Sequence, residues 1–220
     1  MAAAVVVVVA IVAAVAVLTL RSSAPMAGPE APPPQPQRQT ATTCTHSESS
    51  GEVPETGMVS AGGLSFPLSV APDWERKAEH RVPNSIDAVS LAETVSETED
   101  MTWIGQVTVG ITNFAPSLSL SEQAELMVKC IVGSELYDRA APKLGEFTPV
   151  SGRLDGMPTS TIDVPITVTI DDPTVRGDDL VVIIVGTNPT TYFMGSSPIG
   201  DADRRSVVEA AIQKLHVSAL

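Results

Sequence analysis

The sequence predicts an α+β domain with a mostly antiparallel sheet and two main helices, preceded by one N-terminal transmembrane helix and a disordered linker. Three kinds of pattern lead to this fold class: segments that alternate apolar and polar residues, one apolar run without alternation, and two helical stripes. Along the chain they follow one another as strand, strand, helix, strand, strand, strand, helix. That order is typical of helices layered on an antiparallel sheet.

Residues 1–20 contain no charged residue and consist almost entirely of Ala, Val, Ile and Leu. A helix of this length, at about 1.5 Å per residue, matches the hydrocarbon core of a bilayer, which is roughly 30 Å thick. We interpret the segment as a retained signal anchor. A cleaved signal peptide is the alternative, although its apolar region is usually only about 7–15 residues long.

The orientation of this anchor is less clear from the charges. The only cation near the apolar run is Arg21, on its C-terminal side, and the positive-inside rule alone would place the following domain in the cytoplasm. A basic stretch upstream of the present first residue would resolve the conflict. We expect a single-pass protein of the cell membrane whose C-terminal domain is extracytoplasmic.

Residues 21–63 have the composition of a linker. They show no hydrophobic period and are dominated by Pro, Ser, Thr, Gly and Gln, with a proline cluster at residues 32–36. Because so few apolar groups cannot offset the entropy lost on ordering, we expect this span to be disordered. It would hold a folded domain, residues 64–220, clear of the membrane.

Three of the expected strands of this domain have a clear pattern. Apolar residues alternate around residues 107–111 and again along residues 162–170, so each of these strands has one apolar face. Pro165 lies in the second strand and favours an edge or a bulge, because proline cannot donate to a ladder. Residues 180–185 are apolar without alternation, which is typical of a strand buried on both faces.

Two segments read as helices. The first spans residues 119–136, where Ser119 and Glu122 have the spacing of a capping box. The second begins at Asp201 or Asp203 and ends near Lys214 and His216. The expected apolar stripes are Leu120, Ala124, Met127, Cys130 and Ile131 in the first helix, and Val208, Ala211, Ile212 and Leu215 in the second. Between the helices, Asp155-Gly156 predicts a hairpin turn.

Net charge and motifs exclude several classes of function. The formal net charge is −13, and such a surface repels phosphate backbones, so we expect no nucleic acid partner. The three histidines, His46, His80 and His216, are scattered and accompany no nucleophile motif. The acidic pairs Asp171-Asp172 and Asp178-Asp179, and the cluster of Glu97, Glu99 and Asp100, match no calcium loop and are interpreted as solvated turns. We expect no metal, no cofactor and no enzymatic activity.

Cys44 and Cys130 are the only cysteines. An even count beyond a membrane segment fits one disulfide in an oxidising compartment. The alternative is a buried thiol at Cys130 and a free thiol at Cys44. A zinc site is disfavoured, because Cys44 and His46 have no partner cluster.

Aromatic residues suggest one candidate binding groove. Trp74 beside a turn, Trp103 at a strand start and Tyr192 could line it, since aromatic side chains dominate binding sites. Packing in the core explains the same residues equally well.

The domain also resembles known proteins. The segment Leu64-Ser65-Phe66-Pro67-Leu68, the segment Ala71-Pro72-Asp73-Trp74, the pair Tyr192-Phe193 after a long apolar strand and the helix at residues 207–217 carry the resemblance. In these features the chain is similar to actinobacterial membrane-anchored extracytoplasmic proteins of unassigned function, and more distantly to PsbP-like α/β/α sandwiches of envelope lipoproteins. The resemblance implies an adaptor or binding module and carries over no catalytic residue. The chain lacks a lipobox, which leaves anchoring to residues 1–20.

These observations predict a binding or scaffold module of the cell envelope. Its partner would be an envelope protein or a small ligand. An accessory component of a secretion machine and a secreted hydrolase are the alternatives from other classes.

Overall fold

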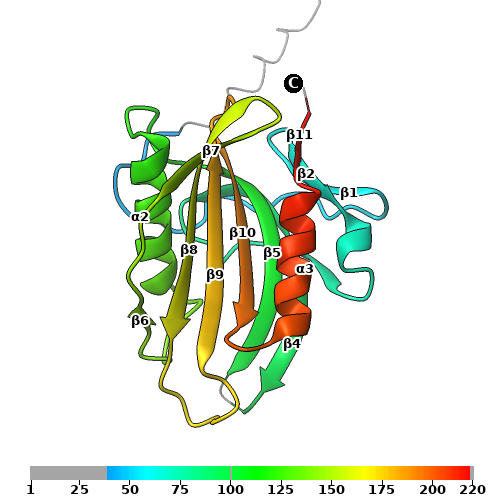
Figure 1. Ribbon diagram of the computed structural model, residues 1–220, viewed down its shortest axis with the longest axis vertical. Helices are drawn as coiled ribbons and strands as arrows, with labels where there is room; N and C mark the ends of the chain where they lie inside the picture. Colours follow the sequence, from blue (N-terminus) through cyan, green and yellow to red (C-terminus); the bar gives the residue numbers. More distant parts are fainter. Residues whose placement is uncertain (1–38, 100, 219–220) are drawn as a thin grey trace, which may run out of the picture. The chain divides into compact units, whose positions relative to one another are not determined.

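The computed structural model describes residues 39–99 and 101–218 (Figure 1). The predicted membrane anchor and residues 21–38 of the predicted linker lie outside the described residues. Within the described ranges, no helix is both long and apolar enough to cross a membrane.

The domain is built on an eight-stranded antiparallel sheet. Seven strands follow the order β3-β4-β5-β10-β9-β8-β6, and β7 also pairs with β8. The strands are β3 (Glu75–Ala78), β4 (Ser85–Glu97), β5 (Thr102–Thr112), β6 (Lys143–Leu144), β7 (Val150–Leu154), β8 (Met157–Thr167), β9 (Gly177–Val185) and β10 (Thr191–Pro198). The described elements therefore confirm a mostly antiparallel α+β architecture.

A second, smaller sheet and two helices cover the main sheet. The small sheet is antiparallel and contains β1 (Met58–Ala61), β2 (Leu64–Pro67) and β11 (His216–Val217), with a short 3-10 turn at Leu68–Val70. Helix α2 (Leu120–Val132) lies against β8 and β9, whereas α3 (Ala202–Gln213) lies against β10 and β5. Figure 1 shows the two helices on either side of the sheet, with α3 beside the small sheet.

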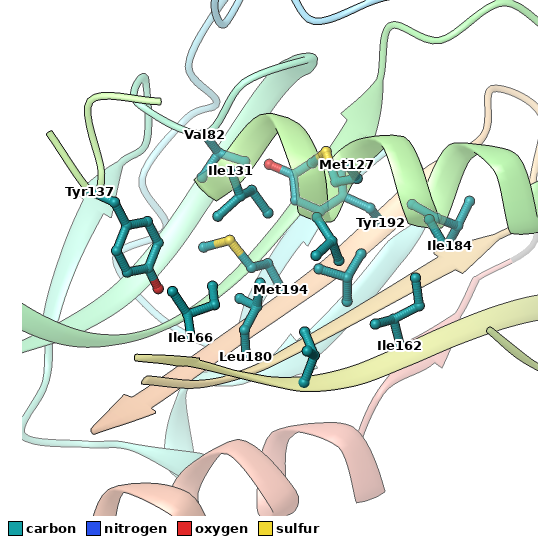
Figure 2. Packing of buried hydrophobic residues seen from close by; sticks show 14 of the residues in the cluster. Val82, Met127, Ile131, Tyr137, Ile162, Ile166, Leu180, Ile184, Tyr192 and Met194 are labelled. Atoms are coloured by element: carbon teal, nitrogen blue, oxygen red, sulfur yellow. The ribbon is translucent and has the colours of Figure 1, made fainter. Parts of the chain in front are cut away.

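The position of β9 between two cores explains why its sequence does not alternate apolar and polar residues. Successive side chains of a strand point to opposite faces, so each face of β9 contributes to a different core. Leu180, Val182 and Ile184 pack under α2, in the cluster that Figure 2 shows. The intervening residues, Val181, Ile183 and Val185, pack against the α3 side. The prediction of a strand buried on both faces is confirmed.

Pro165 lies where its missing donor is harmless. Pro165 lies opposite Asp179 of β9. Its carbonyl accepts a hydrogen bond from the Gly145 amide on the other edge of β8, next to β6. Because the N–H and C=O of one strand residue point the same way, the absent N–H also faces the β6 side. That side of β8 pairs only with the short strands β6 and β7, which agrees with the predicted position near an edge.

The predicted helix starts are confirmed, but both helices end earlier than expected, and α2 stops at Val132 instead of residue 136. Ser119 and Glu122 form a complete capping box, and Asp201 caps α3 by accepting from the Arg204 amide. Helix α3 stops at Gln213 and His216 belongs to β11, so the expected helical C-terminus at His216 is wrong. His216 instead places its Nδ1 2.7 Å from Oδ2 of Asp155, in the β7–β8 turn.

The Ser119→Ala variant is expected to lose about 1 kcal/mol of unfolding free energy, because the first turn of α2 loses its cap. The Ser119 hydroxyl accepts from the Glu122 amide, and the Glu122 carboxylate accepts from the Ser119 amide at 2.8 Å. Urea unfolding followed by circular dichroism measures the change. The nearby Ser117→Ala variant, outside the capping box, is the control, and an equal effect of both substitutions would contradict the role of the cap.

The described part of the predicted linker, residues 39–63, belongs to the folded domain. The Gln39 amide donates to the carbonyls of Thr112 and Thr190 and accepts from the Thr190 amide. Backbone bridges join Ala41 to Phe114 and Ser50 to Ala88, and residues 58–61 form β1. Polar and backbone contacts order residues 39–57, and Val59 and Ala61 of β1 are buried in the core on the α3 side, so the domain includes residues from 39 onward.

The structure also joins Cys44 to Cys130 in a disulfide, with the two Cα atoms 5.4 Å apart. Of the two alternatives that the sequence left open, the disulfide is therefore the one formed. It ties the N-terminal segment to helix α2.

Candidate functional site

A cavity of about 720 Å³ lies at the end of the sheet where the β4–β5 turn meets the β8–β9 connection. Both turns are at the lower end of the sheet in Figure 1. The connection between α2 and β6 adds Arg139 to the lining. Antiparallel pairing brings these turns together although they are some distance apart in the sequence.

One side of the cavity is apolar. Trp103 and Val175 are each 5% exposed and belong to the core under α2. Met101 and Ile170 are partly buried and pack against the same core. An organic ligand can therefore bury apolar surface here without rearrangement of the core.

Asp172 fixes the two turns to each other. Its carboxylate accepts from the Ser96 hydroxyl at 2.5 Å, from the Thr174 hydroxyl at 2.6 Å and from the Thr174 amide at 2.8 Å. These hydrogen bonds, the Ser96 bond foremost, lower the pKa of Asp172, so it stays ionised near neutral pH. The β8–β9 connection is thereby attached to the end of β4.

Charges of both signs surround the opening of the cavity. Glu99, Asp171 and Arg139 are exposed and line it, and none of them forms an ion pair within 4 Å with another described residue. Arg139 has a positive φ of 68°, uncommon for a residue with a side chain. The rim thus presents polar groups for a ligand above an apolar floor.

A buried carboxylate supports the wall of the cavity. Asp178 accepts from Trp103 Nε1 at 3.1 Å and from the Tyr137 hydroxyl at 2.8 Å. The two rings meet edge to face, with centroids 5.8 Å apart. Burial raises the pKa of Asp178 to about 6, although both donors act in the opposite direction. Burial also raises the pKa of Tyr137, so Tyr137 remains a donor.

The Asp178→Asn variant is expected to flatten the dependence of stability on pH between about pH 4 and pH 7. The pKa of Asp178 rises from 3.8 to about 6 on folding, so the unfolded chain releases this proton first. In that window the wild-type chain loses stability as the pH rises, by about 3 kcal/mol in total. Urea unfolding at a series of pH values measures the effect. Identical pH profiles for the two proteins would contradict it.

The structure does not assemble the groove that the sequence suggested. Trp74 packs in the core on the α3 side, whereas Trp103 and Tyr192 pack in the core on the α2 side. Tyr192 is fully buried and its hydroxyl lies 2.8 Å from that of Ser85, so it does not reach the cavity. Of the three candidates only Trp103 lines the site.

The sequence pattern did not mark the other residues of the site, or indicated that they were solvent-exposed. Glu99 and the pair Asp171-Asp172 come from two turns that looked like separate solvated loops. Asp100 lies outside the described residues. Met101, Ile170 and Arg139 have no local pattern that marks them, because only the strand order brings their turns together. In the part of the chain that the structure describes, no three His, Cys, Asp or Glu side chains are grouped to hold a metal ion.

The fold and the cavity together define an α+β domain with a ligand-sized cavity at one end of its main sheet. No family model matches the sequence, and no curated protein matches it. Among solved structures, the chain is similar to the solution structure of cyanobacterial PsbP from Synechocystis sp. PCC 6803. The identity is 13%, the TM-score is 0.48, and the match covers 77% of this chain and 98% of that chain. A likeness of this size assigns no ligand, partner or activity.

Proposed function

We propose that the chain is a ligand-binding module of the cell envelope and that the cavity beside Trp103 is its binding site. The observation that carries the proposal is the cavity itself. Its volume of about 720 Å³ falls within the range of small-molecule sites, roughly 300–1,000 Å³. An apolar floor with charged groups at the opening suits a small organic ligand that has an apolar body and a polar end.

The polar groups of the cavity favour binding over catalysis. Ser96 is the hydroxyl nearest to a carboxylate, and it donates to Asp172. The pKa of that carboxylate is lowered, which makes it a poor general base near neutral pH. We therefore propose a binding role and no reaction, with the secreted hydrolase as the weaker alternative.

Isothermal titration of the full chain with indole, tryptamine and indole-3-acetate tests this site. The three probes share an aromatic body and differ in charge. We expect at least one to bind saturably. The Met101→Ala variant, which removes part of the cavity floor, should weaken that binding by roughly tenfold, because a buried Met side chain contributes about 1.5 kcal/mol or more.

Met58→Ala is the matched control, since Met58 is 39% exposed on β1 and does not line the cavity. Its affinity should equal that of the wild type. Absence of saturable binding by all three probes, or equal weakening by both substitutions, would contradict the proposed site.

We also propose that the domain lies outside the cytoplasm and that residues 1–20 anchor it in the membrane. The disulfide between Cys44 and Cys130 supports this placement, because disulfides persist in oxidising compartments. The apolar, uncharged composition of residues 1–20 supports the anchor.

Labelling of intact cells with a membrane-impermeant maleimide tests the placement. Cys44 is exposed and Cys130 is buried, so reductant should expose one reactive thiol, at Cys44. We expect labelling of intact cells only after reduction, and none of a Cys44→Ser variant. Labelling only after cell lysis, without dependence on reductant, would contradict an extracytoplasmic domain.

A further inference from the structure

A second, much smaller hollow of about 40 Å³ shares Trp103 with the larger cavity as a lining residue. We propose that this hollow, which we call the amine crevice, binds the ammonium group of a small protonated amine. Its polar walls are Asp178, Gln106 and Tyr137, and its apolar walls include Ile131, Leu180 and Met194. The proposal is independent of the larger cavity and of what binds there.

The first observation is a buried carboxylate without a cation. Asp178 is 4% exposed, and its two oxygens accept from neutral donors, Trp103 and Tyr137. Within the described residues, no Lys, Arg or His nitrogen lies within 4 Å of it. A buried carboxylate is strongly destabilised unless a positive charge or further hydrogen bonds compensate it. Each of its oxygens retains a lone pair for another donor.

The second observation is a buried acceptor that lacks a donor. Gln106 is 3% exposed, and its side-chain Oε1 has no hydrogen-bond partner among the described residues. Gln106 lies on β5, opposite Ser196 of β10, and both residues line the crevice. A buried acceptor left without a donor costs about 1–3 kcal/mol. The crevice therefore presents two acceptors, one of them charged, that need a donor.

Arg81 lines the crevice but already has a partner. Its guanidinium pairs with the buried carboxylate of Glu79, with Nη2 3.3 Å from Oε2. Arg81 therefore does not supply a paired positive charge for Asp178.

The size and walls of the crevice match a short amine. A water molecule occupies about 30 Å³ in the liquid, and an ammonium group needs similar space. Figure 2 shows Tyr137, Ile131, Met194 and Leu180 at the same end of the core cluster. An ammonium group offers three donors for Asp178 and Gln106, and the apolar walls accommodate an attached methyl group. Water could supply donors as well, but it brings no charge for the carboxylate.

The chain offers a direct readout, because Trp103 and Trp74 are its only tryptophans. Indole N–H signals of the full chain are followed by NMR during titration with methylammonium chloride, sodium chloride or methanol. We expect a saturable shift of the Trp103 signal with methylammonium alone, while the Trp74 signal stays in place. An equal shift with sodium chloride or methanol, or no saturable shift, would overturn the proposal.

Two variants test the two acceptors, Asp178 and Gln106, and a third variant is the control. Asp178→Asn should abolish the saturable shift, and Gln106→Met should weaken methylammonium binding at least fivefold. Met58→Ala, at a residue that lines neither the crevice nor the larger cavity, should leave methylammonium binding unchanged. Binding that persists in Asp178→Asn would overturn the proposal. If N-acetyl-lysine methylamide competes with methylammonium, the ammonium group that the crevice binds belongs to a lysine side chain of a partner. If it does not compete, the ammonium group belongs to a free amine.

Discussion

Reduction of the Cys44–Cys130 disulfide is expected to lower the free energy of unfolding by about 4–5 kcal/mol, the chain-entropy value for a closed loop of this length. The cysteines are 86 positions apart, so the cross-link restricts a large part of the unfolded chain. In the folded chain it attaches the segment before β1 to α2. Urea unfolding of the full chain with and without reductant measures the difference.

The Cys44→Ser variant is the control for this experiment. Cys44 is exposed, so the substitution removes the bond and little else. Its unfolding midpoint should match that of the reduced wild type and should not respond to reductant. A wild-type midpoint that is the same in both conditions would contradict a stabilising cross-link.

The Phe66→Ala variant is expected to lose about 3–5 kcal/mol of unfolding free energy, because a fully buried aromatic side chain is replaced by a cavity. Phe66 is 0% exposed on β2 and meets Phe193 of β10 edge to face, with centroids 6.1 Å apart. It thus joins the small sheet to the main sheet. Urea unfolding followed by tryptophan fluorescence and circular dichroism measures the loss.

Val150→Ala is the matched control, since Val150 is 64% exposed on β7 and its truncation should change stability by less than about 0.5 kcal/mol. Both probes should report one transition in the Phe66→Ala variant. A small loss, or separate transitions for the two sheets, would show that the small sheet is not part of the same cooperative unit.

Elements with a strong local period could be predicted from the sequence. The apolar run of β9, the alternation along β8 and the capping box of α2 each specify their own structure. The folded segment at residues 39–57 could not be predicted in this way. Its order depends on long-range polar contacts, such as that of Gln39 with Thr190 and that of Asn84 with the Thr43 carbonyl. Composition alone carries no signal of such contacts.

The candidate site was harder to predict than the fold. Trp103 could be selected as an aromatic residue at a strand start, but nothing local separates it from Trp74, which faces the opposite core. The pairing of Ser96 with Asp172 depends on which turns share one end of the sheet. That information lies in the strand order, which no single segment encodes. Gln106 and Asp178 likewise can be recognised as candidate ligand acceptors only from their burial.

The central claim is that a ligand occupies the cavity beside Trp103, and methyl-resolved NMR of the full chain tests it most directly. Indole, tryptamine and indole-3-acetate are titrated in turn, and the methyl signals of Met101, Ile170 and Met58 are followed. Met101 and Ile170 line the cavity, and Met58 does not. We predict that for at least one probe the Met101 and Ile170 signals shift with a single saturation curve while Met58 stays in place. Shifts at Met58 alone, or no saturable shift at Met101 and Ile170 with all three probes, would contradict the claim.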